Sequence, residues 1–225
     1  MLAFTGYGSR LSFVVCSRSE GLPLTSPALH PRLLGGSLAI DFVNTTPAND
    51  ALSWERLIQF LEATGIVSAD RGTQLLALPE SDLPAAEGLL HKSQRLSSAL
   101  HKAFAALLRK QKIAVEWVEP VNEILRVTEG HDELVSVVGG WRMEFIAREG
   151  GLDWLLAAVA RSGAEILSEG TRASLHLCAN PHCGLFFYDT SRTHRRRWCS
   201  MAVCGNRSKV AAFARKHASA RHASP

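Results

Sequence analysis

Several features that would place a chain in a distinctive class are missing from this sequence. No uninterrupted apolar run approaches the about eighteen residues that a membrane-spanning helix needs. The apolar run at 11–16 is interrupted by Ser12 and is shorter than the hydrophobic region of a signal peptide. With 46% hydrophobic and 20% charged residues, the composition is that of an ordinary soluble globular protein. We therefore expect a soluble, cytoplasmic protein that does not enter a membrane.

The motifs of common enzyme classes are missing as well. The sequence contains no G-x-S-x-G, G-x-x-x-x-G-K-[ST], G-x-G-x-x-G or H-E-x-x-H pattern. His91 and His101 fall on one predicted helix, but they are ten residues apart and lack acidic partners at ligand spacing, so we expect both on the surface. These absences argue against an enzyme, and no catalytic residue is predicted.

Cysteine is scarce, with five residues in the chain, yet four of them are close together near the C-terminus. They form a Cys-x4-Cys pair, fifteen intervening residues and a second Cys-x4-Cys pair, a spacing typical of a closed tetrahedral zinc site. Disulfide bonds are the alternative, but they need an oxidising compartment. His182 and His194 are rival ligands, which we expect beside the four cysteines without binding the metal, or on the surface. The pattern predicts one structural Zn²⁺ held by Cys178, Cys183, Cys199 and Cys204.

Acidic residues are almost absent from the C-terminal part of the chain. From Arg172 onward there are ten lysines and arginines and one acid, Asp189, whereas the preceding residues carry 15 basic and 20 acidic side chains. A basic segment on a mildly acidic body indicates that this segment alone faces a polyanion. The candidate nucleic-acid contacts are Arg192, His194, Arg195, Arg196, Arg197, Asn206, Arg207, Lys209, Arg215 and Lys216.

The residues around the cysteines predict a treble-clef-like finger. Strand patterns at 174–177 and 185–188 precede a run at 195–199 that we expect to return as the second strand of the finger's hairpin. Alternate strand residues face opposite sides, so the arginines at 195–197 cannot all reach one groove, and some must contact phosphate or pack over the metal site. A helix is predicted from about Arg207 or Ser208, with Asn206 as its cap and Val210, Phe213 and His217 packed on the hairpin. Trp198 is expected in the finger's core.

These motifs resemble a known family. The Cys-x4-Cys pair, Phe187-x-Asp189-x-Ser191-Arg192, 197–201 (RWCSM) and 204–207 (CGNR) resemble the CGNR zinc finger. That finger typically follows an ABATE domain, in a family described as stress-induced transcription regulators, and residues 36–45 resemble the start of such a domain. The resemblance implies a zinc-dependent module that binds nucleic acid, with double-stranded DNA as the expected partner.

The body preceding the finger is predicted to be a mostly helical α+β domain with a small hairpin. Apolar periodicity predicts helices at 52–64, 69–78, 84–110, 116–126 with Pro120 in its first turn, and 152–168. Strands are predicted at 133–138 and 141–147 across Gly139-Gly140, with Trp141, Met143 and Phe145 on a buried face. Asp41 and Asn44 lie in an apolar setting, where capping or local hydrogen bonding is favoured over a ligand site.

These patterns together predict four segments: a disordered extension at 1–32, an ABATE-like domain at 33–170, a CGNR-type finger at 172–217 and a disordered tail at 218–225. Cys16, in the extension, is expected to be an incidental thiol. We expect a DNA-binding regulator whose finger grips DNA and whose body senses an effector (a small molecule or a protein) or forms a homodimer. The alternatives are an RNA-binding protein, a protein-interaction adaptor, and a thiolate redox switch.

Overall fold

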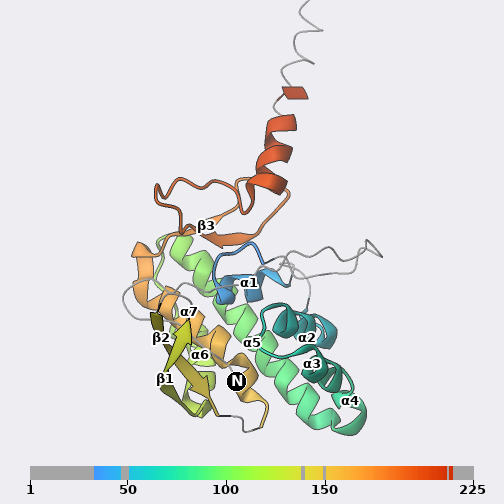
Figure 1. The fold of residues 1–225 in the computed structure, drawn as a ribbon. Helices are drawn as coiled ribbons and strands as arrows, with labels where there is room; N and C mark the ends of the chain where they lie inside the picture. Colours follow the sequence, from blue (N-terminus) through green and yellow to red (C-terminus); the bar gives the residue numbers. More distant parts are fainter. Residues whose placement is uncertain (1–32, 47–50, 138–139, 149–150, 212, 215–225) are drawn as a thin grey trace, which may run out of the picture.

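The computed structural model describes residues 33–46, 51–137, 140–148, 151–211 and 213–214. The predicted extension at 1–32, with Cys16, and the predicted tail at 218–225 lie outside these residues, as do Pro47, Gly139, Arg215, Lys216 and His217. Within them, a helical body carries a two-stranded hairpin on one side and the cysteine-rich segment at one end (Figure 1). The architecture is therefore α+β and mostly helical, as the sequence predicts.

The first helices of the body begin and end at residues whose side chains suit those positions. α1 (Leu38–Asn44) is followed by α2 (Trp54–Ala63), where the Ser53 hydroxyl accepts the Arg56 N–H at 3.3 Å. α2 stops before Gly65, which adopts a φ of 72° that other residues rarely tolerate. α3 (Ala69–Leu76) is capped in the same way by Ser68, and α4 (Leu78–Ser81) is a single turn. The predicted helix at 69–78 is thus α3, which ends two residues earlier than predicted, and α4 follows it.

The longest helix, α5 (Leu83–Leu108), runs through the centre of the body. Asp82 caps its N-terminus by accepting the Ala85 N–H at 3.1 Å. Its buried stripe includes Leu96, Leu100 and Phe104, which are inaccessible to solvent. α7 (Ala157–Glu169) packs closely against this stripe, because a Cβ on Gly163 would lie 2.6 Å from a methyl carbon of Leu100.

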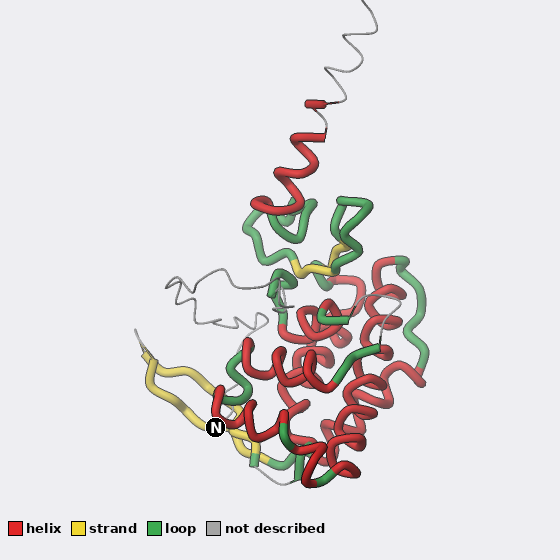
Figure 2. Tube along the Cα trace, turned by 90° about the vertical axis from the view of Figure 1, so that its right-hand side faces the viewer, coloured by secondary structure: helices red, strands yellow, loops and turns green. Residues whose placement is uncertain are grey.

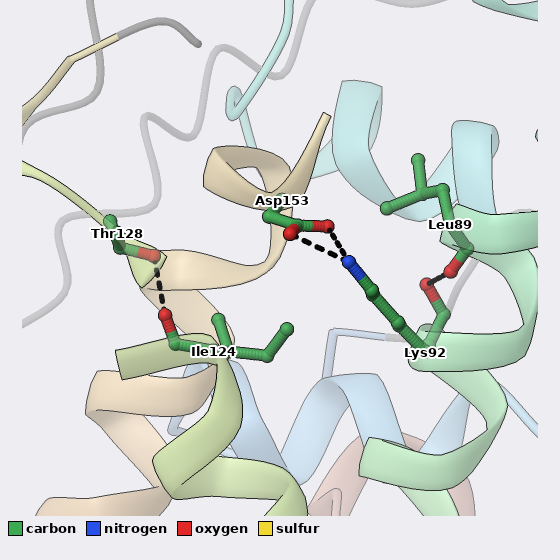
Figure 3. A network of polar contacts seen from close by, with 6 residues as sticks. Leu89, Lys92, Ile124, Thr128 and Asp153 are labelled. Atoms are coloured by element: carbon green, nitrogen blue, oxygen red, sulfur yellow. Dashed lines mark hydrogen bonds and ion pairs between the residues drawn. The ribbon is translucent and has the colours of Figure 1, made fainter. Parts of the chain in front are cut away.

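α6 (Val115–Val127) corrects one prediction. The helix begins five residues before Pro120, so this proline lies inside the helix and not in its first turn. Proline lacks the N–H that would bond to the carbonyl of Glu116, which is an exposed residue. The helix ends at Thr128, whose hydroxyl donates to the Ile124 carbonyl at 2.7 Å (Figure 3).

After the hairpin the chain returns to the body through a 3-10 turn, η1 (Asp153–Leu156). Lys92 of α5 forms a 2.7 Å ion pair with Asp153 and so ties this turn to the long helix (Figure 3). Trp154, Leu155, Ala158 and Ile166 are buried, as their spacing predicts. A second 3-10 turn, η2 (Gly170–Arg172), then leads to the cysteine-rich segment.

The hairpin pairs β1 (Gly130–Val137) with β2 (Gly140–Ala147) antiparallel, which confirms the predicted hairpin with slightly longer strands. It extends from the side of the helical body (Figure 2). The prediction that Trp141 is buried is wrong, because 72% of this residue is exposed. Among the described elements no helix packs extensively on the hairpin.

Candidate metal centre and basic surface

The first cysteine pair lies on a tight turn between two short strands. β3 (Leu175–Leu177) and β4 (Phe186–Tyr188) pair antiparallel on either side of this turn. The Cys178 N–H donates to the Leu185 carbonyl at 2.9 Å, and the Cys183 N–H donates to the Asn180 carbonyl at 2.9 Å. Gly184 follows with a φ of 68°. Backbone hydrogen bonds of this turn therefore hold both Cys178 and Cys183 in place.

This pairing corrects the predicted hairpin of the finger. Residues 195–199 form a loop, and the partner of β4 is β3. The hydrogen bonds of the loop give the reason, because backbone N–H groups of the loop donate to a side chain. The Arg196 N–H donates to Asp189 Oδ2 at 2.9 Å, and the Ser191 N–H donates to Asp189 Oδ1 at 2.9 Å. A buried carboxylate thus supplies the acceptors that a strand would supply.

The second cysteine pair spans the start of the last helix. The Ser200 hydroxyl accepts the Val203 N–H at 3.3 Å, and the π-helical turn η3 (Met201–Gly205) follows. The chain continues helically through the described residues that follow. The α-helical residues begin at Asn206, close to the predicted start near Arg207 or Ser208, and the π-helical turn extends this helix back to Met201 with Ser200 as its cap. Asn206 is not the cap, and its amide donates to the Ala202 carbonyl at 3.2 Å.

The four cysteine sulfur atoms converge on one point. All four lie within 4.8 Å of one another, and none of these cysteines forms a disulfide bond. The Cys183 and Cys199 sulfurs are 3.6 Å apart, and the Cys199 and Cys204 sulfurs are 3.7 Å apart. Ligands about 2.3 Å from a tetrahedral Zn²⁺ lie about 3.8 Å from one another. The donor set and its spacing fit one structural zinc ion.

The surroundings of the sulfurs favour a bound cation. Burial raises the pKa of the Cys183 thiol, and burial together with the neighbouring thiols raises that of Cys199 well above its usual range. The pKa of Cys204 is lowered. Burial alone would raise this pKa, but the Asn180 amide, which donates to the Cys204 sulfur at 3.4 Å, and the other thiols outweigh burial. The Cys199 N–H donates to the Cys178 sulfur at 3.5 Å. Four thiolates so close together require a cation, and zinc supplies that charge.

Arg196 packs inward over this centre. Its guanidinium donates to the carbonyls of Trp198, at 2.9 Å, and of Cys199, and it lies 4.8 Å from the centre of the Phe187 ring. It also donates to the Leu34 carbonyl of the body at 3.3 Å. Outward and inward orientations alternate among the three arginines at 195–197, as expected, although these residues form a loop and not the predicted strand. This placement favours a structural role for Arg196 over the contact with nucleic acid that the sequence predicts.

β4 joins the finger to the body because its residues alternate between two cores. Phe187 lies in a small cluster with the buried cysteines, whereas Phe186 lies in the core of the body. The centres of the His101 and Phe186 rings lie 5.1 Å apart with the ring planes nearly perpendicular, and burial lowers the pKa of His101. His101 is therefore half-buried, which corrects its prediction as a surface residue, while His91 is exposed as predicted.

Polar contacts fix the same junction. The Asn44 side chain forms two hydrogen bonds with the Phe186 backbone, and the Tyr188 N–H donates to the Gly35 carbonyl at 2.6 Å. The Gly35 N–H in turn donates to Asp41 Oδ1 at 2.6 Å. The sequence singles out Asp41 and Asn44 only as polar residues in an apolar setting. Their partners lie far along the chain, so the finger contact of Asn44 has no sequence signal.

Comparison with known families agrees with this geometry. Residues 175–217 match the family model described as CGNR zinc finger, and residues 36–170 match the ABATE model, described as putative stress-induced transcription regulator. The second match covers more than half of the chain. The chain belongs to the ABATE family. No curated protein matches the sequence closely.

Most predicted contact residues of the CGNR finger lie on its surface. The exposed residues are Arg192, His194, Arg195, Arg197, Asn206, Arg207 and Lys209. The Arg197 guanidinium lies 5.1 Å from the ring centre of Trp198, which is half-buried against the cysteine cluster and donates to the Ser208 hydroxyl at 3.2 Å. His182 is exposed and is not among the four clustered ligands.

The last helix differs from its prediction. Val210 and Phe213 are 69% and 66% exposed, so they do not pack inside the finger as the sequence predicts. The helix begins at the metal centre and projects away from the body (Figure 1). Arg207 and Lys209 therefore stand on a helix whose N-terminal end is part of the metal centre. No helix among the described residues is long and apolar enough to cross a bilayer.

Proposed function

We propose that this ABATE-family protein is a zinc-dependent, cytoplasmic DNA-binding protein that regulates transcription, with a stress-related role suggested by the family description. The observation that carries the proposal is the outward placement of basic side chains around a folded metal centre. Arg192, Arg195 and Arg197 are exposed on a loop whose backbone is held by Asp189 and Arg196. Guanidinium groups on a fixed loop suit bidentate contacts with phosphate.

The last helix supplies a second element for the same partner. It carries Arg207 and Lys209, exposed, on a segment that projects beyond the finger and can approach a groove of DNA. The zinc ion in this proposal folds the module. With four cysteine ligands it is coordinatively closed, so it offers no position for activating water, and neither matched family is described as an enzyme.

A single finger has a small contact area, so we propose that useful affinity comes from a homodimer assembled through the body. Two fingers on one DNA molecule convert the second binding event into an intramolecular one. The body is then left to sense an effector, which the family description does not identify. Duplex DNA is preferred over RNA because of the transcription-regulator description.

The test is fluorescence anisotropy of the zinc-loaded protein on random duplex DNA across a salt series. Linear weakening with the logarithm of salt concentration is expected, with a slope of about 0.9 per phosphate contact. Arg192→Ala/Arg195→Ala/Arg197→Ala should weaken binding and reduce the slope. The matched control is Arg71→Ala/Arg95→Ala/Arg126→Ala, which removes the same charge from exposed arginines of α3, α5 and α6.

Equal loss of affinity in the two triple variants would reduce the effect to net charge and contradict the proposed site. Competition between duplex DNA and structured RNA at equal salt separates DNA binding from RNA binding. No binding of either polynucleotide at low salt, with one zinc per chain, would leave an adaptor that docks an acidic protein. Chelation of zinc should abolish DNA binding if the metal is needed to fold the basic surface of the finger.

A further inference from the structure

The long helix α5 and the loop after it form a basic stretch within an acidic body. No aspartate or glutamate occurs at 88–115, which includes most of α5. The basic residues of this stretch are Lys92, Arg95, Lys102, Arg109, Lys110 and Lys112. The residues before Arg172 contain more acids than bases overall, so this stretch is a local exception to the charge of the body.

The basic residues of the stretch fall into two groups. Lys92 forms an ion pair with Asp153 at 2.7 Å, and Arg95 forms one with Glu123 at 2.9 Å. The residues of the second group are exposed and, within the described chain, form no ion pair. This second group, here named the α5 cations, consists of Lys102, Arg109, Lys110 and Lys112.

Stabilisation of the helix accounts for only part of the second group. A cation at the C-terminal end of a helix interacts favourably with the helix dipole, and Arg109 at the C-cap is placed to do so. Lys102, however, precedes the last turn of α5, and Lys112 lies beyond the end of the helix. Like charges that are close in sequence repel one another, and a bound polyanion would offset this repulsion.

The end of α5 that carries the α5 cations is the end that meets the finger. The ring centres of His101 and Phe104 lie 5.1 and 6.1 Å from that of Phe186 in β4. α5 also contacts η2 and β3, and Figure 1 shows its C-terminal end next to β3. The α5 cations therefore belong to the part of the body that adjoins the finger.

The arginine-rich loop of the finger is bonded to the segment that α5 contacts. The Asp189 N–H donates to the Ser174 carbonyl at 2.8 Å, and the Ser174 hydroxyl lies 3.2 Å from Nδ1 of His194. Ser174 connects η2 to β3, the two elements that α5 contacts. η2 itself carries Arg172, which is exposed. Residues 170–177 thus link the end of α5 to the arginine-rich loop.

We propose that the α5 cations form a second phosphate-binding surface, which contacts the same DNA duplex as the arginine-rich loop. The inference rests on the proposed function and adds the body to the DNA interface. It revises the expectation, drawn from the charge distribution, that the C-terminal segment alone faces the polyanion. Exposed lysine and arginine side chains without acidic partners suit contacts with phosphates, which position a protein on DNA without reading the sequence.

The junction of body and finger supports a combined surface. The hydrogen bonds between Asn44 and Phe186 hold β4 on the body, so the α5 cations and the arginine-rich loop have a fixed relative orientation before DNA binds. A preorganised surface avoids the entropic cost of ordering two separate parts on the DNA. The body therefore contributes to affinity as well as carrying the finger.

Lysine acetylation of the full zinc-loaded chain, read by mass spectrometry, tests the contact directly. The probe is random duplex DNA, and the measured quantity is the ratio of acetylation at each lysine without and with DNA. Lys102 and Lys112 should be protected several-fold, together with Lys209 of the finger. Lys92 is the internal control, because it lies on the same helix and is paired with Asp153. Protection of Lys209 without protection of Lys102 and Lys112 would overturn the inference and leave the proposed function standing.

Fluorescence anisotropy of charge variants on the same DNA gives a second measurement. Lys102→Gln/Arg109→Gln/Lys112→Gln should weaken binding several-fold and lower the salt slope by up to about 2.7, at about 0.9 for each lost phosphate contact. Lys110 stays unchanged because its φ of 54° belongs to the end of α5. A salt slope equal to that of the wild type would contradict the contact.

The matched control removes the same charge from exposed arginines of α3, α5 and α6 that lie outside the α5 cations. It is Arg71→Gln/Arg95→Gln/Arg126→Gln, and its salt slope should equal that of the wild type. Equal loss in the control and in the α5 variant would reduce the effect to net charge and refute the second surface. Absence of binding by the wild type, or preference for structured RNA at equal salt, would instead refute the proposed function together with this inference.

Discussion

Asn44 on α1 and Phe186 on β4 form a reciprocal pair of hydrogen bonds across the junction of body and finger. The Asn44 amide donates to the Phe186 carbonyl at 2.8 Å, and the Phe186 N–H donates to Asn44 Oδ1 at 3.0 Å. One side chain thus satisfies both backbone groups of a residue whose ring lies in the core of the body. The finger is therefore fixed to the body through β4.

Asn44→Ala should therefore destabilise the whole chain. The substitution leaves two backbone groups of Phe186 without their partners, and each loss in a part-buried site costs about 1–3 kcal/mol. The free energy of unfolding, measured in urea, should fall by at least the cost of one such group. Asn206→Ala is the matched control, because it removes one hydrogen bond from an exposed asparagine. Equal, small effects of the two substitutions would contradict the role given to Asn44.

Much of this architecture is predictable from the sequence because local signals determine it. The spacing of the cysteines identifies the metal centre, and the apolar stripe that includes Leu96 and Phe104 identifies the long helix. The errors occur where one polar side chain accepts backbone hydrogen bonds and overrides the pattern of the surrounding residues. The carboxylate of Asp189 turns the arginine-rich segment into a loop, and Ser200 starts the last helix early. Neither interaction leaves a periodic pattern in the sequence from which it could be predicted.

Arg195 and Arg196 should respond in opposite ways to alanine substitution, although they are neighbours of the same type. Arg196→Ala removes the donors to the Trp198 and Cys199 carbonyls beside the zinc site, so zinc release to a colorimetric chelator should become faster. Arg195→Ala removes an exposed side chain and should leave zinc release unchanged. DNA affinity at low temperature, before zinc is lost, should show the larger effect for Arg195→Ala. The reverse assignment would show that Arg196 is the contact residue.

Zinc removal should destabilise more than the finger. Metal analysis should give one zinc per chain, and Cys204→Ser should lower that ratio because it removes one of four ligands. Leu175 and Phe186 belong to the hydrophobic core of the body, so loss of the finger exposes apolar surface of both parts. The melting temperature followed by helical circular dichroism should therefore fall on chelation. An unchanged helical transition would show that the body folds independently of the metal.

Asp41 should make the stability of the chain depend on pH near neutrality. Burial raises the pKa of this carboxyl to about 7, against hydrogen bonds from the Gly35 and Leu34 backbone and the charge of Arg196, which lower it. The folded chain therefore binds a proton more tightly than the unfolded chain, whose aspartate pKa is the ordinary 3.8. The stabilisation is fully present below pH 3.8 and is lost as the pH rises to about 7, so its contribution falls across this window.

Asp41→Asn keeps an acceptor for the Gly35 N–H but cannot ionise, so it should remove this pH dependence. The difference in unfolding free energy between the variant and the wild type is the quantity to measure, because protonation of the zinc ligands and of Glu165, whose pKa burial also raises to about 7, affects both chains alike. Between pH 5 and 7 the variant should gain stability relative to the wild type, by about 1.4 kcal/mol for each pH unit at most. A constant difference across this range would show that Asp41 is already ionised in the folded chain, with Arg196 compensating its burial.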